Sequence, residues 1–215
     1  MTDTSVATEL PAPPTNLVLK KIAVGHGIQN YTCQSTTSDV KATGAVAVLY
    51  DVTTLYPGTA KTGLGQGVWD KLPSTLLWNT PLPLNKLAGS KYGADSVKPF
   101  PKGESLKVQG LPDIKFLGHH FFDANSVPMF DLSAAGLKAS VVKTGDAKAP
   151  ANADKGIIGT GAVAWLQLGE SGLGLSNGLS LVYRVITAGG AAQTCAEVNG
   201  AAQSVPYATF YWFYG

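Results

Sequence analysis

Short apolar runs, several of them alternating with a two-residue period, extend along most of this chain. Such alternation is typical of half-buried β-strands, and we identify no segment with a sustained 3.6-residue period. Strands that follow one another without helices between them favour an antiparallel sandwich or barrel. We therefore predict an all-β fold with strands at 17–24, 28–33, 45–52, 106–108, 114–122, 137–143, 157–168, 179–187 and 204–214.

Two parts of the chain lack this pattern. Residues 1–16 contain three prolines and are expected to form an extended lead-in. Residues 53–105 are rich in glycine and proline and are expected to form a long irregular insertion, with at most a short helical turn near Leu76 or Leu84. The remaining 17–215 is expected to be one β domain that carries this insertion, since 215 residues suit a single domain.

Charge is scarce in this sequence. Charged residues make up 14% of the chain, the formal net charge is +2, and Arg184 is the single arginine. A hydrophobic content of 45% is enough to build a core, which excludes a disordered chain. So few cationic side chains, nearly all of them lysine, argue against a nucleic-acid partner. No apolar run reaches the roughly 18 residues of a membrane span.

Cys33 and Cys195 are the only cysteines. Their spacing does not fit a zinc site, so they form either a structural disulfide or a catalytic thiol, and we favour the disulfide. A disulfide implies an oxidising compartment and hence an extracellular location. The first residues lack the apolar stretch of a signal peptide, so either the peptide has been removed or the protein is intracellular. Asn30 begins an N-glycosylation sequon within a predicted strand, where a glycan would fit only at an exposed edge.

Several short motifs resemble one known family. They are GIQNYTC at 27–33, GHHF at 118–121, WLQL at 165–168, YRVIT followed by two glycines at 183–190, VPY at 205–207 and the final FY at 213–214. Together they resemble an uncharacterised family of secreted fungal and bacterial proteins. The resemblance implies secretion and a β-fold, and it implies no known reaction. Fungal members of that family are often labelled malate dehydrogenase.

The malate dehydrogenase label can be tested on one motif. Residues 159–164 (GTGAVA) fit the G-x-G-x-x-A fingerprint of dinucleotide sites. That fingerprint needs a strand before it, a helix after it and an acidic residue about 20 positions later. Here a strand-like WLQL follows, and Ser180 and Leu181 occupy the place of the acid. These residues therefore argue against dehydrogenase activity, and we expect no cofactor.

The best candidate for chemistry is the segment that contains His119, His120 and Asp123. On a strand, His119 and Asp123 would share one face and His120 would point to the other. His119 and Asp123, joined by His26 or Asp131, could form an acid–base pair or a metal site of unknown identity. The resemblance instead singles out His120. The alternative is a packed histidine whose ring is satisfied by a backbone carbonyl.

Arg184 lies in the middle of a predicted strand. Its planar guanidinium could bind a ligand carboxylate, or it could pair with a buried acid such as Asp51. We favour the structural pair and keep the ligand as the alternative.

Aromatic residues suggest a binding role. Those in the insertion could stack on sugar rings or apolar ligands, or could form a small core that holds the insertion in place. The last strand carries aromatics on both faces, which indicates burial on both sides or, alternatively, a platform for a sugar or a homodimer interface. The insertion aromatics are Tyr56, Trp69, Trp78 and Tyr92.

Three hypotheses for function follow. The first is an extracellular binding or surface module for a cell-wall glycan or a small apolar ligand. The second is an enzyme that uses the neighbourhood of His119, His120 and Asp123, and the third is a subunit-interaction protein.

Overall fold

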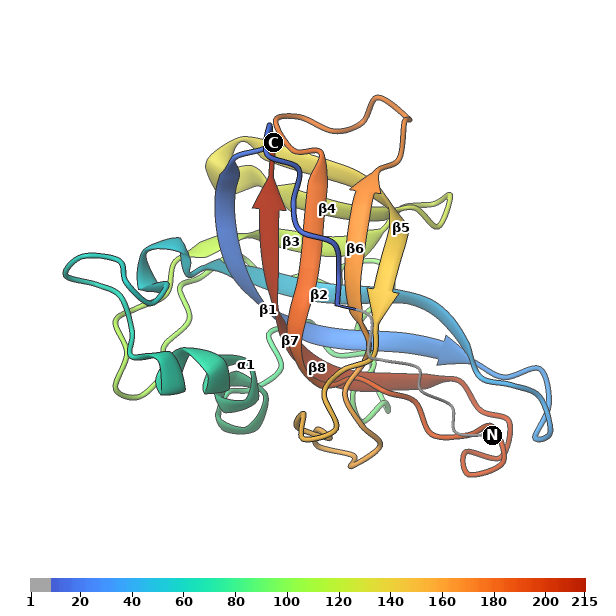
Figure 1. The fold of residues 1–215 in the computed structure, drawn as a ribbon. Coiled ribbons are helices and arrows are strands. Elements are labelled where there is room, and N and C mark those ends of the chain that lie inside the picture. The colour runs from blue at the N-terminus through green and yellow to red at the C-terminus, as the bar shows by residue number, and fades with distance from the viewer. Residues whose placement is uncertain (1–8) are drawn as a thin grey trace, which may run out of the picture.

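The computed structural model describes residues 9–215, and its centre is a closed barrel of eight antiparallel strands (Figure 1). Neighbouring strands follow chain order, and the last strand pairs with the first to close the barrel. The predicted all-β class is confirmed, and of the two expected architectures the barrel is the one formed. The strands are β1 (Leu19–Thr32), β2 (Lys41–Asp51), β3 (Phe116–Phe122), β4 (Pro128–Leu132), β5 (Leu137–Ala147), β6 (Trp165–Glu170), β7 (Leu181–Gly189) and β8 (Gln203–Tyr214).

The strand β1 is one continuous strand where two were predicted. The predicted break falls at Gly25 and Gly27, and both glycines sit inside the strand. A Cβ on Gly27 would lie 2.0 Å from the backbone oxygen of Val46 on β2. The glycines therefore mark the close approach of neighbouring chain segments rather than a turn.

Other strand boundaries also differ from the prediction. The strand β4 was not predicted, and 157–164 is not a strand because β6 begins only at Trp165. The predicted strand at 106–108 is reduced to a single bridge between Leu106 and Ile114. The strand β5 continues to Ala147, beyond its predicted end at residue 143.

The insertion contains the helix α1 (Gln66–Asn79), which is far longer than the short helical turn expected near Leu76 or Leu84. Its buried residues are spaced three and four apart, as on one face of a helix. Pro73 lies within the helix and Gly65 caps it, and these residues masked the pattern. A short 3-10 helix, Thr53–Leu55, also lies in the insertion. The buried residues of α1 are Trp69, Leu72, Pro73, Leu76 and Leu77.

Two apolar clusters lie on the two sides of the barrel wall. The helix α1 packs against the outside, where Trp69 stacks on Phe210 of β8 at 4.3 Å. Side chains alternate along a strand, so Tyr211 and Phe213 of β8 point inward, where both are fully buried with Phe130. Both faces of β8 are thus largely covered, which explains why the strand carries aromatic residues on both of them.

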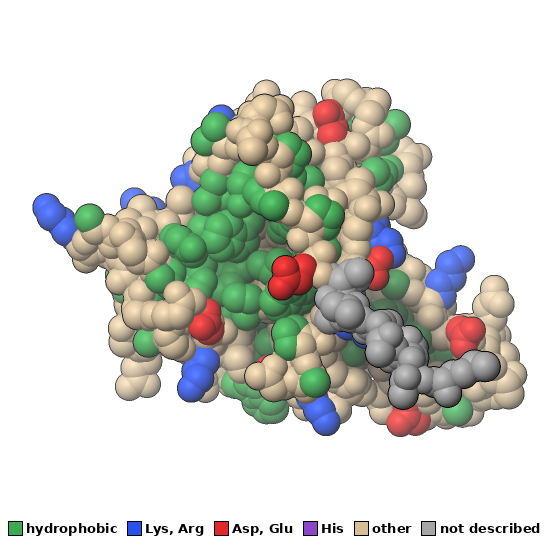
Figure 2. All heavy atoms as spheres, viewed as in Figure 1, with side chains coloured by type: hydrophobic (Ala, Val, Ile, Leu, Met, Phe, Trp, Pro, Cys, Tyr) green, Lys and Arg blue, Asp and Glu red, His purple; other side chains and the backbone are tan. Residues whose placement is uncertain are grey.

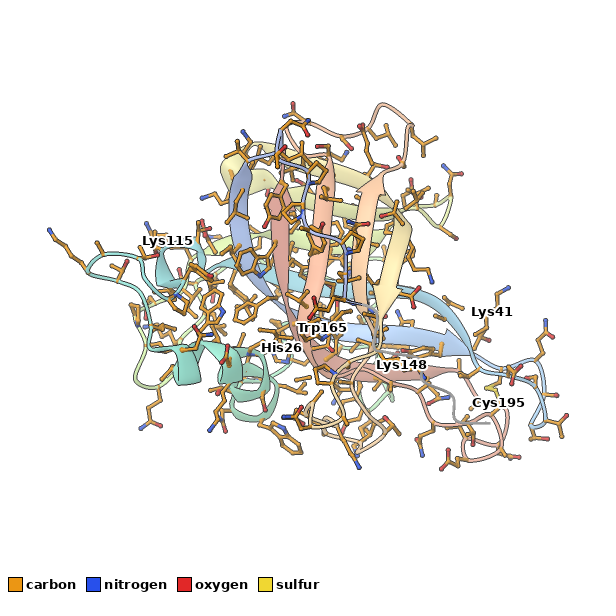
Figure 3. The ribbon with its side chains drawn as sticks, viewed as in Figure 1. His26, Lys41, Lys115, Lys148, Trp165 and Cys195 are labelled. Atoms are coloured by element: carbon orange, nitrogen blue, oxygen red, sulfur yellow. A yellow bond between two sulfur atoms is a disulfide. The ribbon has the colours of Figure 1, made fainter. Side chains whose placement is uncertain are left out.

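The disulfide between Cys33 and Cys195 is confirmed, with the two Cα atoms 5.7 Å apart. It ties the chain just beyond the end of β1 to the loop between β7 and β8. Cys195 is labelled in Figure 3.

Across residues 9–215, we find no helix that is both long and apolar enough to span a membrane.

Candidate ligand-binding sites

His120 points into the barrel and is 4% exposed. Its ring stacks on Phe130 at 4.1 Å. Its Nδ1 lies 2.9 Å from the carbonyl oxygen of Met129, which can only accept, so Nδ1 carries the proton and donates it. Burial lowers the pKa of His120 to about 4. His120 is thus a neutral, packed histidine satisfied by a backbone carbonyl.

His119 lies on the outer side of the same strand. Its ring stacks on Phe100 of the insertion at 3.9 Å, and its buried Nε2 has no hydrogen-bond partner in the described part of the chain. Burial lowers the pKa of His119, and the carboxylate of Asp131, opposite it on β4, offsets part of that effect.

Asp123 lies beyond the end of β3, where its carboxylate accepts the backbone N–H groups of Asn125 and Val127 and so closes the turn to β4. The three candidate residues His119, His120 and Asp123 therefore face the outside, the inside and a turn. Within residues 9–215, no group of three or more His, Cys, Asp or Glu side chains could hold a metal ion. This arrangement gives no support to the enzyme hypothesis.

His26, the other histidine considered, also faces outward and is buried under the end of α1. The hydroxyl of Thr80 donates to the carbonyl of Leu76, so it can only accept the hydrogen bond from Nδ1 of His26, at 3.2 Å. Burial lowers the pKa of His26 to about 4. Its ring is engaged in holding the helix end.

Arg184 points into the barrel and has no carboxylate partner among residues 9–215. Its Nε and one terminal nitrogen donate to the carbonyl of Ala164 at 3.2 and 2.8 Å. Asp51 instead pairs with Lys21 at 2.7 Å, so the suggested pairing of Arg184 with Asp51 was wrong. Arg184 lines none of the cavities described below, and it is nine-tenths buried.

The surroundings of Arg184 include polar residues that the sequence analysis missed. The hydroxyls of Tyr207 and Tyr211 lie 2.8 Å apart inside the barrel, and Gln29 lies near them. Burial raises the pKa of both tyrosines, although the charge of Arg184 acts in the opposite direction. Both tyrosines are therefore neutral at neutral pH, and dipoles rather than a counter-ion surround the guanidinium. The alternation of β1 and β8 could have shown that these residues share the barrel interior.

The four aromatic residues of the insertion do not converge on one site. Trp69 is 2% exposed and belongs to the cluster under α1, and Tyr56 packs edge-on against it. Trp78 is 55% exposed, and its indole donates to Asp154. Tyr92 lies in another part of the insertion, next to Lys91.

A different set of aromatics forms a cavity of about 630 Å³ on the outside of β6, β7 and β8. We call it the aromatic cavity. Its floor is formed by Trp165, Tyr183, Val185, Trp212 and Tyr214, and its walls by residues 9–13 and 147–151. The buried indole nitrogens of Trp165 and Trp212 both lack an acceptor among residues 9–215. Figure 2 shows hydrophobic side chains gathered on this side, over β1, β8 and β7, and Figure 3 labels Trp165 and Lys148.

The barrel register brings the floor of the aromatic cavity together. Tyr183 and Trp212 are directly paired across β7 and β8. The hydroxyl of Tyr183 donates to the carbonyl of Pro11 at 2.8 Å and accepts the amide of Gln167 at 2.9 Å. The bond to Pro11 holds the lead-in beside the floor, and the bond from Gln167 orients the hydroxyl of Tyr183. Figure 1 shows the lead-in crossing β7.

A second hollow, of about 840 Å³, lies between the barrel and the insertion. We call it the loop cleft. Outward residues of β1, β2 and β3 form its floor, including Asn30, Val46 and Phe121, and segment 87–100 of the insertion forms its roof. Asn30 lies on a strand paired on both sides, so it is not at the exposed edge that a glycan was expected to need, and its side chain faces outward into the loop cleft instead. Its side-chain oxygen accepts the hydroxyl of Ser204 at 2.8 Å.

Comparison with protein families gives a match over residues 13–215 to a family described as "Protein of unknown function (DUF3455)". The chain belongs to this family. Its expected membership of an uncharacterised family is thereby confirmed. The comparison with curated proteins gives no match, and neither does the comparison with solved structures.

The DUF3455 match includes all eight strands, α1 and the floors of both cavities. Because the family description names no reaction, the chemistry must be inferred from the geometry. The G-x-G-x-x-A motif at 159–164 lies in an irregular segment with a single bridge at Ala162, and β6 follows it where the fingerprint requires a helix. The DUF3455 barrel thus does not give this motif its nucleotide-binding context.

Proposed function

We propose that this DUF3455 chain is an extracellular binding module that holds a small apolar ligand in the aromatic cavity. The observation that carries the proposal is the convergence of Trp165, Tyr183, Trp212 and Tyr214, from three strands, on one cavity of about 630 Å³. Ligand sites are typically concave, mostly apolar and about 300–1,000 Å³ in volume. The cavity meets these conditions.

The lining favours an apolar ligand over a sugar. The charged side chains that line the cavity are Glu9 and Lys148, and they come from the walls rather than the floor. A sugar would need several polar side chains to replace its hydrogen bonds with water. An apolar ring or acyl group needs none, and its burial is favourable at roughly 25 cal/mol per Å².

The extracellular location is supported by the disulfide between Cys33 and Cys195. Disulfides persist in oxidising compartments and are rare in the cytosol. Fractionation of cells that produce the natural protein would test this part of the proposal. Detection in the medium or the wall fraction is expected, and detection only in the cytosol would contradict it.

The test of binding is titration of the protein with N-phenyl-1-naphthylamine, a neutral dye that fluoresces in apolar sites. We expect saturable binding to the wild type. The substitution Val185→Glu places a charge on the cavity floor and Trp165→Ala removes part of the floor. Each should weaken dye binding about tenfold or more.

The matched control is Trp78→Ala, since Trp78 is an exposed tryptophan outside the aromatic cavity. This variant should bind the dye within about twofold of the wild type. Circular dichroism of each variant confirms folding. Absence of binding to the wild type, or equal loss in all three variants, would contradict the proposal. So would dye release as the molecular mass doubles with protein concentration, because the cavity would then be a contact between two copies.

A further inference from the structure

The loop cleft differs chemically from the aromatic cavity. Phe100 and Phe121 give it aromatic surface, and their ring centroids are 6.3 Å apart. Small apolar residues line much of the rest, and hydroxyl, amide, imidazole and carboxylate side chains add polar groups, among them Asn30, His119 and Asp95. Flat apolar surface beside several small polar groups suits a molecule whose own surface is divided in the same way.

Hydrogen-bonding capacity remains free in the cleft. The side-chain oxygen of Asn30 accepts the hydroxyl of Ser204, which orients the amide nitrogen and leaves its two N–H groups unused within residues 9–215. One oxygen of Asp95 accepts the backbone N–H groups of Val97 and Lys98, and its other oxygen has no such partner. The cleft thus offers fixed donors and a fixed acceptor.

The lining contains no lysine or arginine. Anionic ligands such as phosphate are usually held by those cations, so the cleft does not suit an anion. Its one acidic side chain, Asp95, can accept hydrogen bonds from the hydroxyl groups of a neutral ligand. A neutral molecule with hydroxyl groups on its edges and C–H groups on its faces is a sugar.

We propose that the loop cleft is a carbohydrate site for a neutral oligosaccharide, packed on Phe121 and bonded by Asn30 and Asp95. This site is separate from the aromatic cavity and does not depend on the function proposed for it. The sugar has two possible sources. One is a free oligosaccharide, and the other is a glycan attached to Asn30 itself, because the sequon Asn30-Tyr31-Thr32 lines this cleft.

The first arm of the test uses protein from the bacterial periplasm, where disulfides form and this sequon is not glycosylated. Calorimetric titrations use chitotetraose, cellotetraose and laminaritetraose as the probes. Binding of at least one of them is expected, and Phe121→Ala should weaken it about fivefold or more. Tyr92→Ala is the matched control, because Tyr92 lies in the same insertion but does not line the cleft. It should leave the affinity unchanged.

The second arm uses protein secreted by a eukaryotic host. A glycan on Asn30 is detected as a mass increase that Thr32→Ala abolishes while keeping Asn30 in place. If the glycan lies in the cleft, a glycosidase that cuts at the asparagine should release it far more slowly from the folded protein than from the unfolded protein.

Sugar binding in the first arm or a protected glycan in the second supports the proposal and identifies the source. The proposal is overturned if none of the three sugars binds and Asn30 carries no glycan, or carries one that is released equally fast from both forms. It is also overturned if Phe121→Ala and Tyr92→Ala weaken binding equally. The dye titration of the aromatic cavity is run on the same samples, so failure of one site is distinguished from failure of the other.

Discussion

His119 and His120 are neighbours in the chain, yet their rings lie on opposite sides of the barrel wall, one against Phe100 and the other against Phe130. The separation follows from the alternation of side chains along β3. The two imidazoles therefore cannot act on one substrate, and their buried environments favour the neutral form of each.

The stability of the protein should fall as the pH drops below about 6.5, in part because of His120. Burial lowers its pKa from 6.5 to about 4, so between these values the unfolded chain binds a proton that the folded chain does not. The contribution is fully present above pH 6.5 and is lost as the pH falls toward 4. At pH 5 the loss from this one group is about 2 kcal/mol.

Urea denaturation at pH 7 and pH 5 measures this effect in the wild type and in His120→Phe. The variant loses the hydrogen bond to Met129 at both pH values, so the difference between the two pH values isolates the titration. That difference should be smaller in the variant by about 2 kcal/mol. An equal difference in both proteins would contradict the neutral, buried state of His120.

Arg184 should tolerate an apolar replacement of similar length better than truncation. Its charge is buried with no carboxylate partner among residues 9–215, so Arg184→Met removes a desolvated cation while still filling space. The carbonyl of Ala164 then loses its hydrogen-bond donors. Arg184→Ala also leaves a cavity and should lose about 2 kcal/mol more than Arg184→Met. Denaturant unfolding measures the stability of both variants. If Arg184→Met is less stable than Arg184→Ala, the charge itself stabilises the barrel and the prediction is wrong.

The disulfide should contribute substantially to stability. Cys33 and Cys195 are 162 residues apart in the chain, and closing so long a loop restricts the unfolded state by about 5 kcal/mol in the entropy model. Double substitution to serine should lower the free energy of unfolding by up to this amount. A change below about 1 kcal/mol would show that the loop ends are already held together in the unfolded chain.

Two glycine-to-alanine substitutions should change the stability of the protein in opposite directions. Gly27→Ala places a Cβ against the backbone of β2 and should disrupt the pairing of β1 with β2. Gly67→Ala lies in α1 with no atom within 4 Å of the added group, and it should stabilise the protein by about 0.5–1 kcal/mol. Thermal unfolding measures the melting temperature of both variants. A Gly27→Ala variant as stable as the wild type would contradict the close approach of β1 to β2 at this position.

The sequence predicts the barrel better than it predicts the insertion. Short runs of apolar and aromatic residues identify β2, β7 and β8. The helix α1 escaped prediction although Trp69, Leu72, Pro73, Leu76 and Leu77 follow helical spacing, because proline and nearby glycines ordinarily indicate a break. Tertiary packing against Phe210 overrides that local preference.

The aromatic cavity illustrates what the sequence leaves open. Alternation along β8 shows that Trp212 and Tyr214 share a face, but not which residues lie beside them. Their neighbours are set by the register of β7 against β8, which pairs Tyr183 with Trp212. Register depends on contacts between distant segments. The insertion aromatics therefore drew attention as the binding site, while the strand aromatics form the cavity.

The most direct test of the proposed binding site is nuclear magnetic resonance of the four indole N–H groups during titration with N-phenyl-1-naphthylamine. Trp165 and Trp212 line the aromatic cavity, whereas Trp69 and Trp78 do not. The signals of Trp165 and Trp212 should shift in a saturable manner while those of Trp69 and Trp78 stay in place. Unchanged signals from the first pair, or shifts confined to the second, would contradict the assignment of the aromatic cavity as the ligand site.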